Sequence, residues 1–97
     1  MIKTITIPEE LRNQAQRANV ERDSRRDILI YIMENNLNIS KERIANYQKE
    51  YDEKYFEFEK IKGIIEKEFV MPVTNNTALN WSLNYDNCLV TIEVPNE

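Results

Sequence analysis

The sequence contains no histidine, one glycine and one cysteine. Without histidine the chain lacks the commonest general base and metal ligand, and one glycine cannot build a glycine-rich loop that holds a phosphate. The single cysteine, Cys88, allows no intramolecular disulfide, and a zinc site needs ligands that are missing here. These absences predict a reduced compartment, no metal or cofactor, and no enzymatic activity of this chain alone.

The remaining catalytic candidates have ordinary structural explanations. Cys88 has no imidazole to activate it, and the strand pattern around it directs its side chain to an apolar face, where a thiol is usually inert packing. The acidic residues of the long central segment alternate with lysines, which is typical of a solvated helix face; they are Glu50, Asp52, Glu53, Glu57 and Glu59. We therefore assign no catalytic residue.

Long hydrophobic runs and excess positive charge are also missing. No segment approaches the roughly 18 apolar residues of a membrane span, and the opening "IKTITIP" does not resemble a basic region followed by an apolar one. The chain has 13 Lys and Arg against 17 Asp and Glu, a net charge of −4. This balance offers no overall attraction for nucleic acid or anionic membrane. We expect a cytoplasmic protein whose partner is a protein, a peptide or a small molecule.

The N-terminal segment alternates β-branched residues on its two faces over residues 2–7, which predicts a strand that Pro8 ends. Pro8 suits the first turn of a helix, and Glu9 and Glu10 follow it near the positive end of the helix dipole. This pattern predicts a first helix over 8–20.

The apolar phase of that helix then meets charge at Arg22 and Arg25. Ser24, with Asp27 three residues later, forms a weak capping box before the apolar run "ILIYIM". We therefore predict a second helix over 24–36. One bent, continuous helix remains an alternative reading.

Ser40 is a good N-cap for a third helix predicted over 41–70, which Pro72 ends. Its length would be about 45 Å at 1.5 Å per residue, longer than the diameter of a compact domain of this size. The helix should therefore overhang, bend or pack on a second chain. The apolar stripe that defines it has steps of three or four residues; its members are Ile44, Tyr47, Tyr51, Tyr55, Phe58, Ile61, Ile65 and Phe69.

The C-terminal stretch 79–94 reads as a β-hairpin around a two-residue turn at Asp86 and Asn87. That turn puts the apolar residues on one face of the hairpin, with Leu89 as the exception; it pairs Tyr85 with Cys88, Leu83 with Val90, Trp81 with Ile92, and Leu79 with Val94. An isolated hairpin is marginal, so the strand over 2–7 should join it. The prediction is a single α+β domain over 1–97 with the order β-α-α-α-β-β.

Part of the N-terminal third resembles the ribbon-helix-helix repressors, in which a strand runs into a Pro-Glu-Glu-Leu helix start. The resemblance is carried by "PEEL" at 8–11 and by "SRRD" at 24–27. It implies a dimeric two-stranded ribbon that inserts Lys3, Thr4 and Thr6 into the major groove. Residues 1–37 are charge-balanced, however, whereas DNA affinity depends chiefly on neutralising phosphates.

A second resemblance covers "RRDILIYIMENN", "YQKEYDEKYFEFEKIK" and "WSLNYDNC". In general sequence character and in the order of their elements, these stretches resemble small accessory proteins found beside radical-SAM enzymes that modify ribosomally made peptides. The resemblance implies a helper that holds a precursor peptide or docks on the modifying enzyme.

We interpret the sequence as a non-catalytic adaptor that binds a larger protein or a peptide and forms a homo-oligomer or a hetero-complex. Protein interfaces are enriched in aromatic residues, although each aromatic residue of this chain could instead fill the core of its own domain. DNA binding as a regulator or antitoxin is the alternative, and a small phage-type inhibitor of a host enzyme is a third. The candidate partner-binding residues are Tyr47, Tyr51, Tyr55, Phe56, Phe58, Trp81, Tyr85 and Leu89. We expect Phe56 to point outward because it lies off the apolar stripe.

Overall fold

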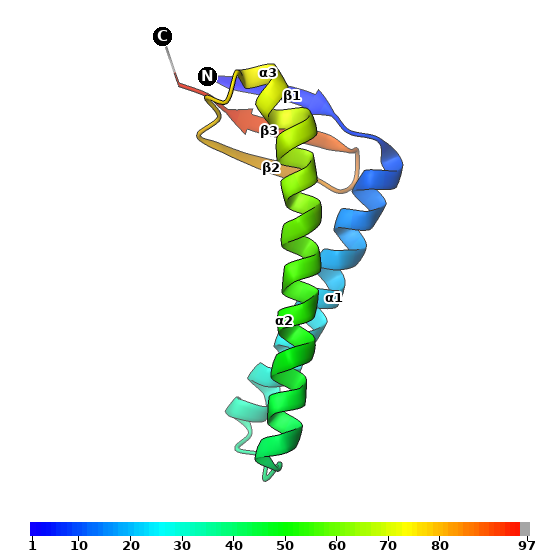
Figure 1. Ribbon diagram of the computed structural model, residues 1–97, viewed down its shortest axis with the longest axis vertical. Coiled ribbons are helices and arrows are strands. Elements are labelled where there is room, and N and C mark those ends of the chain that lie inside the picture. The colour runs from blue at the N-terminus through cyan, green and yellow to red at the C-terminus, as the bar shows by residue number, and fades with distance from the viewer. Residues whose placement is uncertain (96–97) are drawn as a thin grey trace.

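The computed structural model describes residues 1–95, so 96–97 of the expected domain lie outside the described part. Figure 1 shows a small sheet at one end of the molecule and two long antiparallel helices running away from it. The fold is α+β, as the sequence predicts. Its elements in chain order are β1 (Ile2–Thr6), α1 (Glu9–Glu34), α2 (Lys41–Ile65), a π-helical turn η1 (Glu66–Val70), α3 (Met71–Thr74), β2 (Asn80–Asn84) and β3 (Leu89–Glu93).

The sheet is antiparallel with the strand order β1-β3-β2, so the N-terminal strand pairs with the hairpin of its own chain. The predicted hairpin register is confirmed for its two central pairs, since Trp81 faces Ile92 and Leu83 faces Val90. The predicted pair of Leu79 with Val94 lies outside the ladder, and the Leu79 amide donates to the Glu93 carbonyl oxygen. The turn itself differs from the prediction because the strands end at residues 84 and 89, which leaves four residues between them. Cys88 closes this turn with φ of 60°, a left-handed conformation that a two-residue turn would not have required of it.

The core lies between one face of the sheet and the helices that cross it. Strand alternation directs Ile5, Val90 and Ile92 to this face, where α1 and the C-terminal end of α2 cover them. The other face of the sheet has no helix over it (Figure 1). The buried apolar residues of this cluster are Ile7, Ala15, Ile65, Val70, Val90, Ile92 and Val94.

The predicted break between two N-terminal helices is wrong and the alternative of one continuous helix is correct, because α1 runs without interruption from Glu9 to Glu34. Arg22 continues the face that packs on α2, and its guanidinium lies over the Phe58 ring, 4.2 Å from the centroid. One turn away, Lys54 Nζ lies 3.2 Å from a Glu21 carboxylate oxygen across the two helices. Arginine can cover apolar surface with its stem and stack on an aromatic face, so charge at these positions does not end the helical contact.

The predicted end of the third helix at Pro72 is also wrong. After α2 the chain makes the π-helical turn η1 and continues into α3, with Pro72 in the first turn of that short helix. In an α-helix a proline ring clashes with the carbonyl group four residues earlier. The π-helical turn removes that geometry, since the Met71 amide donates to the Glu66 carbonyl oxygen five residues back. Asn75, in a left-handed conformation with φ of 50°, ends the helical run.

The molecule is strongly elongated, with extents of 55 × 28 × 20 Å and a radius of gyration of 17.1 Å. A compact chain of this length would have a radius of gyration of about 12.5 Å. Of the three predicted outcomes for the long helix, overhang is the one observed: the distal half of the α1–α2 hairpin extends beyond the sheet (Figure 1).

Candidate functional site

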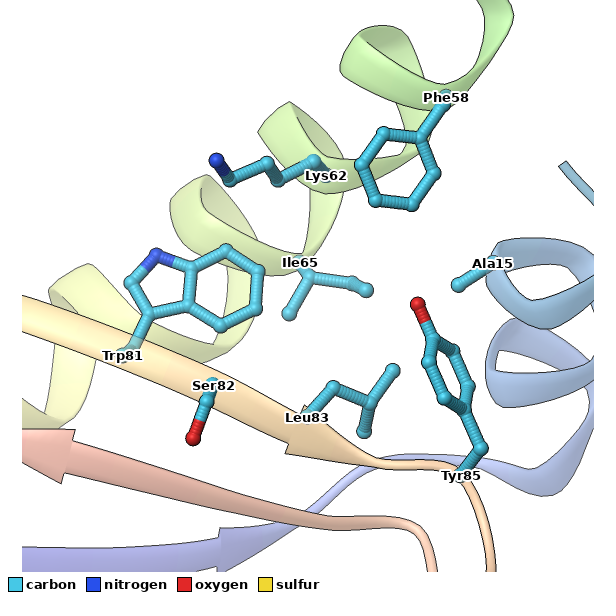
Figure 2. A pocket seen from close by; sticks show the side chains of 8 residues that line it. All are labelled: Ala15, Phe58, Lys62, Ile65, Trp81, Ser82, Leu83 and Tyr85. Carbon is cyan, nitrogen blue, oxygen red and sulfur yellow. The ribbon is translucent and has the colours of Figure 1, made fainter. Parts of the chain in front are cut away.

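Beside β2 lies a hollow of about 160 Å³, formed where α1, α2 and the hairpin meet (Figure 2). We call it the aromatic hollow. Three of the predicted partner-binding aromatics line it together, although they come from distant parts of the sequence. Its walls are Phe58, Trp81 and Tyr85 with Leu83, Ile65 and Ala15, and Lys62 and Ser82 stand at its edge.

The walls of the aromatic hollow are fixed from behind. Phe58 is held by the Arg22 guanidinium that stacks on its ring, and Arg22 also pairs with Asp23 at 3.1 Å. The turn that bears Tyr85 is fastened to α1 because Arg12 Nη1 donates a hydrogen bond of 2.5 Å to the Tyr85 carbonyl oxygen. Ile65, on the inner side, is almost fully buried. These contacts hold the side chains that line the aromatic hollow in place, so its shape exists before any ligand binds.

Two polar groups are available to a ligand. The Tyr85 hydroxyl points into the hollow (Figure 2) and has no hydrogen-bond partner among residues 1–95. Burial raises the pKa of this phenol, the nearby Arg22 charge acts to lower it and Asp23 to raise it, so the group stays a neutral donor. Lys62 runs between Phe58 and Trp81 with its ammonium at the rim, and no carboxylate in the described chain pairs with it.

The outer edge of β2 runs along the aromatic hollow. Because β2 is the last strand in the order β1-β3-β2, one of its edges has no neighbouring strand. The Trp81 amide donates to its neighbour Asn80 Oδ1 at 2.9 Å instead of to a strand. Backbone orientation repeats every second residue, so Leu83 also presents its amide and carbonyl groups at this edge. An unpaired edge of this kind is a template for another extended chain.

The size of the aromatic hollow restricts what it can hold. Pockets for cofactors and drug-sized ligands have volumes of about 300–1,000 Å³, whereas this one has about 160 Å³. It fits one apolar side chain. In residues 1–95 there is also no cluster of three acidic or cysteine groups placed to hold a metal ion.

The other predicted partner-binding residues lie elsewhere. Tyr51 and Tyr55 contact each other along α2, with ring centroids 6.0 Å apart. Phe56 is 71% exposed, as its position off the apolar stripe predicts. Tyr47 lies in a different groove at the distal end of the helices, and Leu89 is half-buried on the helix-free side of the sheet.

The residues of the DNA-binding alternative lie on both sides of β1. Thr4 and Thr6 are exposed on the helix-free face, whereas Lys3 points to the helical side, where its Nζ lies 3.3 Å from the Val73 carbonyl oxygen. A ribbon made from β1 would therefore direct Lys3 away from a groove that Thr4 and Thr6 enter.

Sequence reasoning missed Lys62 and Ile65 as neighbours of Trp81. Ile65 belongs to the predicted apolar stripe of α2, but its distance in sequence from the hairpin gives no sign that Trp81 packs beside it.

Within the described residues no helix has the length and apolar character to cross a membrane. Comparisons with protein-family models, with curated proteins and with solved structures found no match to this chain.

Proposed function

We propose that this protein is a non-catalytic adaptor that binds an extended segment of a partner protein or peptide along the open edge of β2. The observation that carries the proposal is the position of the aromatic hollow directly beside that unpaired edge. In strand addition, backbone hydrogen bonds supply affinity and pockets for alternate side chains supply specificity. Both requirements are present at one place.

The chemistry of the two faces indicates the kind of segment. A strand added to β2 directs every second side chain towards the aromatic hollow, so an apolar residue is required at that position. An acidic residue near it would meet the Lys62 ammonium. The intervening side chains would continue the helix-free face, which is polar and bears Ser82 and Thr91 on β2 and β3. The expected ligand is an extended peptide with alternating apolar and small polar residues.

A precursor peptide of a modifying enzyme, or a segment of such an enzyme, would satisfy these requirements. The size of the hollow supports a binding role, since it accommodates one side chain and leaves no room for a cofactor. In this proposal the chemistry belongs to the larger partner, and the present chain contributes recognition and position.

The test begins with a tagged pull-down from the native host and mass spectrometry, followed by peptides that tile the recovered partner. Trp81 is the only tryptophan in the sequence, so its fluorescence reports directly on the aromatic hollow. Binding should shift its emission and saturate with one peptide per chain. Recovery of no stoichiometric protein or peptide, together with salt-dependent binding to DNA of its own promoter, would favour the alternative of a transcriptional regulator.

Two variants test the site. Lys62→Glu reverses the charge at the rim without touching the core, and it should weaken the peptide about tenfold if an acidic residue lies there. Lys60→Glu makes the same charge change at another exposed position of α2 and is the matched control. Trp81→Ala should abolish binding because a buried aromatic anchor commonly dominates an interface; its affinity is measured by titration calorimetry, since this variant has lost the only tryptophan. Equal affinity of all three variants and the wild type would place the binding surface elsewhere.

A further inference from the structure

The direction of the backbone hydrogen-bonding groups along β2 follows from the pairing of its neighbour β3. The Val94 amide, directly after β3, donates a hydrogen bond of 2.9 Å to the residue before β1. Because this direction alternates along a strand, Thr91 bonds to the other side, where its partner on β2 is Ser82. Trp81 and Leu83, on either side of Ser82, therefore direct their amide and carbonyl groups to the open edge of the sheet.

The two amides at this edge differ in the free chain. The Trp81 amide donates to Asn80 Oδ1 at 2.9 Å, so the side chain of the preceding residue occupies the place of a neighbouring strand. The Leu83 amide has no such side-chain acceptor among residues 1–95, and no other hydrogen bond in that range holds the Asn80 side chain. A short polar side chain that bonds to a nearby backbone amide competes with regular strand pairing. We call this contact the Asn80 cap.

Trp81 connects the Asn80 cap to the aromatic hollow. Its indole lines the hollow (Figure 2), and its amide is the edge group that a partner strand would bind. Side chains alternate between the two faces of a strand, so Asn80 lies on the helix-free side, where it is exposed. Release of the cap therefore exchanges one hydrogen bond for contacts with water.

We propose that the Asn80 cap holds the β2 edge closed in the free protein, and that the Asn80 side chain must turn away before an extended peptide can pair along β2. This inference rests on the proposed function, since it concerns the regulation of the same site. Leu83, whose amide is uncapped, is the first point of backbone contact. Pairing at Trp81 follows when a carbonyl oxygen of the peptide replaces Asn80 Oδ1. The cap also protects the edge from pairing with other copies of the chain, which is a hazard of open edge strands.

The strength of the Asn80 cap determines how far it restricts binding. An ordinary intramolecular hydrogen bond favours the bonded form over the solvated form by about three to ten to one. A peptide that binds only the open form has its apparent affinity lowered by about the same factor. Exchange of the Trp81 amide with water also requires the open form, so the same factor should slow that exchange. Two independent measurements should therefore give one value.

The first experiment measures amide exchange with water by NMR on the isotope-labelled full chain, without any partner. After correction for the effect of neighbouring side chains on intrinsic rates, the Trp81 amide should exchange about three- to tenfold faster in Asn80→Ala than in the wild type. The Leu83 amide should be unchanged. Asn84→Ala is the matched control on the same face of β2, because Asn84 Oδ1 accepts from the Asp86 amide in the turn and not at the edge. Equal Trp81 rates in the wild type and Asn80→Ala would overturn the proposal.

The second experiment measures peptide affinity by titration calorimetry. The probe is a short peptide that alternates leucine and threonine and carries one glutamate, which is the pattern expected for the partner. Asn80→Ala should bind it about three- to tenfold more tightly than the wild type, by the factor found for exchange.

The two experiments separate this inference from the proposed function. Unchanged affinity in Asn80→Ala, together with loss of binding in Trp81→Ala, would overturn the role of the Asn80 cap and leave the proposed function standing. Equal binding by the wild type, Asn80→Ala and Trp81→Ala, with faster Trp81 exchange in Asn80→Ala, would support closure of the edge and place the peptide site elsewhere. A probe that binds neither the wild type nor Asn80→Ala, with the same exchange difference, would likewise support the cap and count against the proposed function.

Discussion

Arg22 occupies a position where a core residue would be expected, so replacing it tests how α1 and α2 are held together. Its side chain is only 19% exposed, and its guanidinium covers the Phe58 ring. A partly desolvated cation–π contact stabilises by about 1–2 kcal/mol, and truncation of the stem also removes apolar packing. Arg22→Ala should therefore lower the free energy of unfolding by about 2 kcal/mol. Arg22→Met, which keeps most of the packing, should lower it by about 1 kcal/mol.

Urea unfolding followed by circular dichroism at 222 nm measures this effect. For a domain of this size the slope m is about 1–3 kcal/mol/M, so Arg22→Ala should lower the urea midpoint by about 1 M without changing the slope. Arg17→Ala is the matched control, because Arg17 is 83% exposed and forms only a surface ion pair with Glu21. Its cost should be below about 1 kcal/mol. An Arg22→Ala midpoint equal to that of Arg17→Ala would refute the stacking argument.

Three further variants or conditions test local features by thermal and urea unfolding. Gly63→Ala should stabilise the protein by about 0.5–1 kcal/mol, because a Cβ at this helical position meets nothing within 4 Å; a lower melting temperature would contradict this. Ser40→Ala should cost about 1 kcal/mol, since the Ser40 hydroxyl accepts a hydrogen bond from the Arg43 amide at the start of α2, and Ser40→Asp should retain the cap. The hydrogen bond from Lys54 lowers the pKa of Glu21 in the folded state. The ion pair therefore stabilises the fold fully above the ordinary pKa of 4.5, and this stabilisation is lost as the pH falls below that value. Glu21→Gln should reduce the loss of stability on the acid side, and an unchanged dependence of stability on pH would contradict this role of Glu21.

The strand pairing could be predicted from the sequence because alternation fixes which residues share a face. Placing Trp81 opposite Ile92 follows from the apolar pattern and from the position of the turn. The conformation of the turn does not follow from that pattern. Asn84 Oδ1 accepts from the Asp86 amide and Asn87 Oδ1 from the Leu89 amide, and these local bonds stabilise a four-residue turn that the pattern cannot distinguish from a shorter one.

The helix boundaries show where a periodic pattern is insufficient. The run of α1 through Arg22 depends on Phe58, which lies on another helix, so no local signal reveals that the arginine is part of the contact. Likewise Pro72 is an ordinary stop signal unless the preceding turn changes from α to π geometry, as η1 does. In both cases a tertiary or backbone adjustment overrides a valid local preference.

The candidate site was predictable only as a set of residue types. Aromatic residues on α2 and in the hairpin could be identified as possible contacts, but the aromatic hollow requires Phe58 and Trp81 to meet across the fold. Tyr51 and Tyr55, on the same predicted stripe as Phe58, lie away from it. The overhang of the long helix was predictable from its length alone. A helix over 41–70 is about 45 Å long at 1.5 Å per residue, which exceeds the diameter of a compact domain of this size.

The pairing of β1 with β3 has a consequence for the order in which the chain folds. The Met1 amino group and the Val94 carbonyl oxygen are hydrogen-bonded although they are 93 residues apart. Closing so large a loop in a flexible chain costs about 4 kcal/mol by the (3/2)RT ln n relation, before its constant term. The α1–α2 hairpin forms through contacts closer in sequence, and once formed it brings the chain ends near each other. The helices therefore act as the scaffold for folding, and the sheet that bears the aromatic hollow should be the last part to assemble.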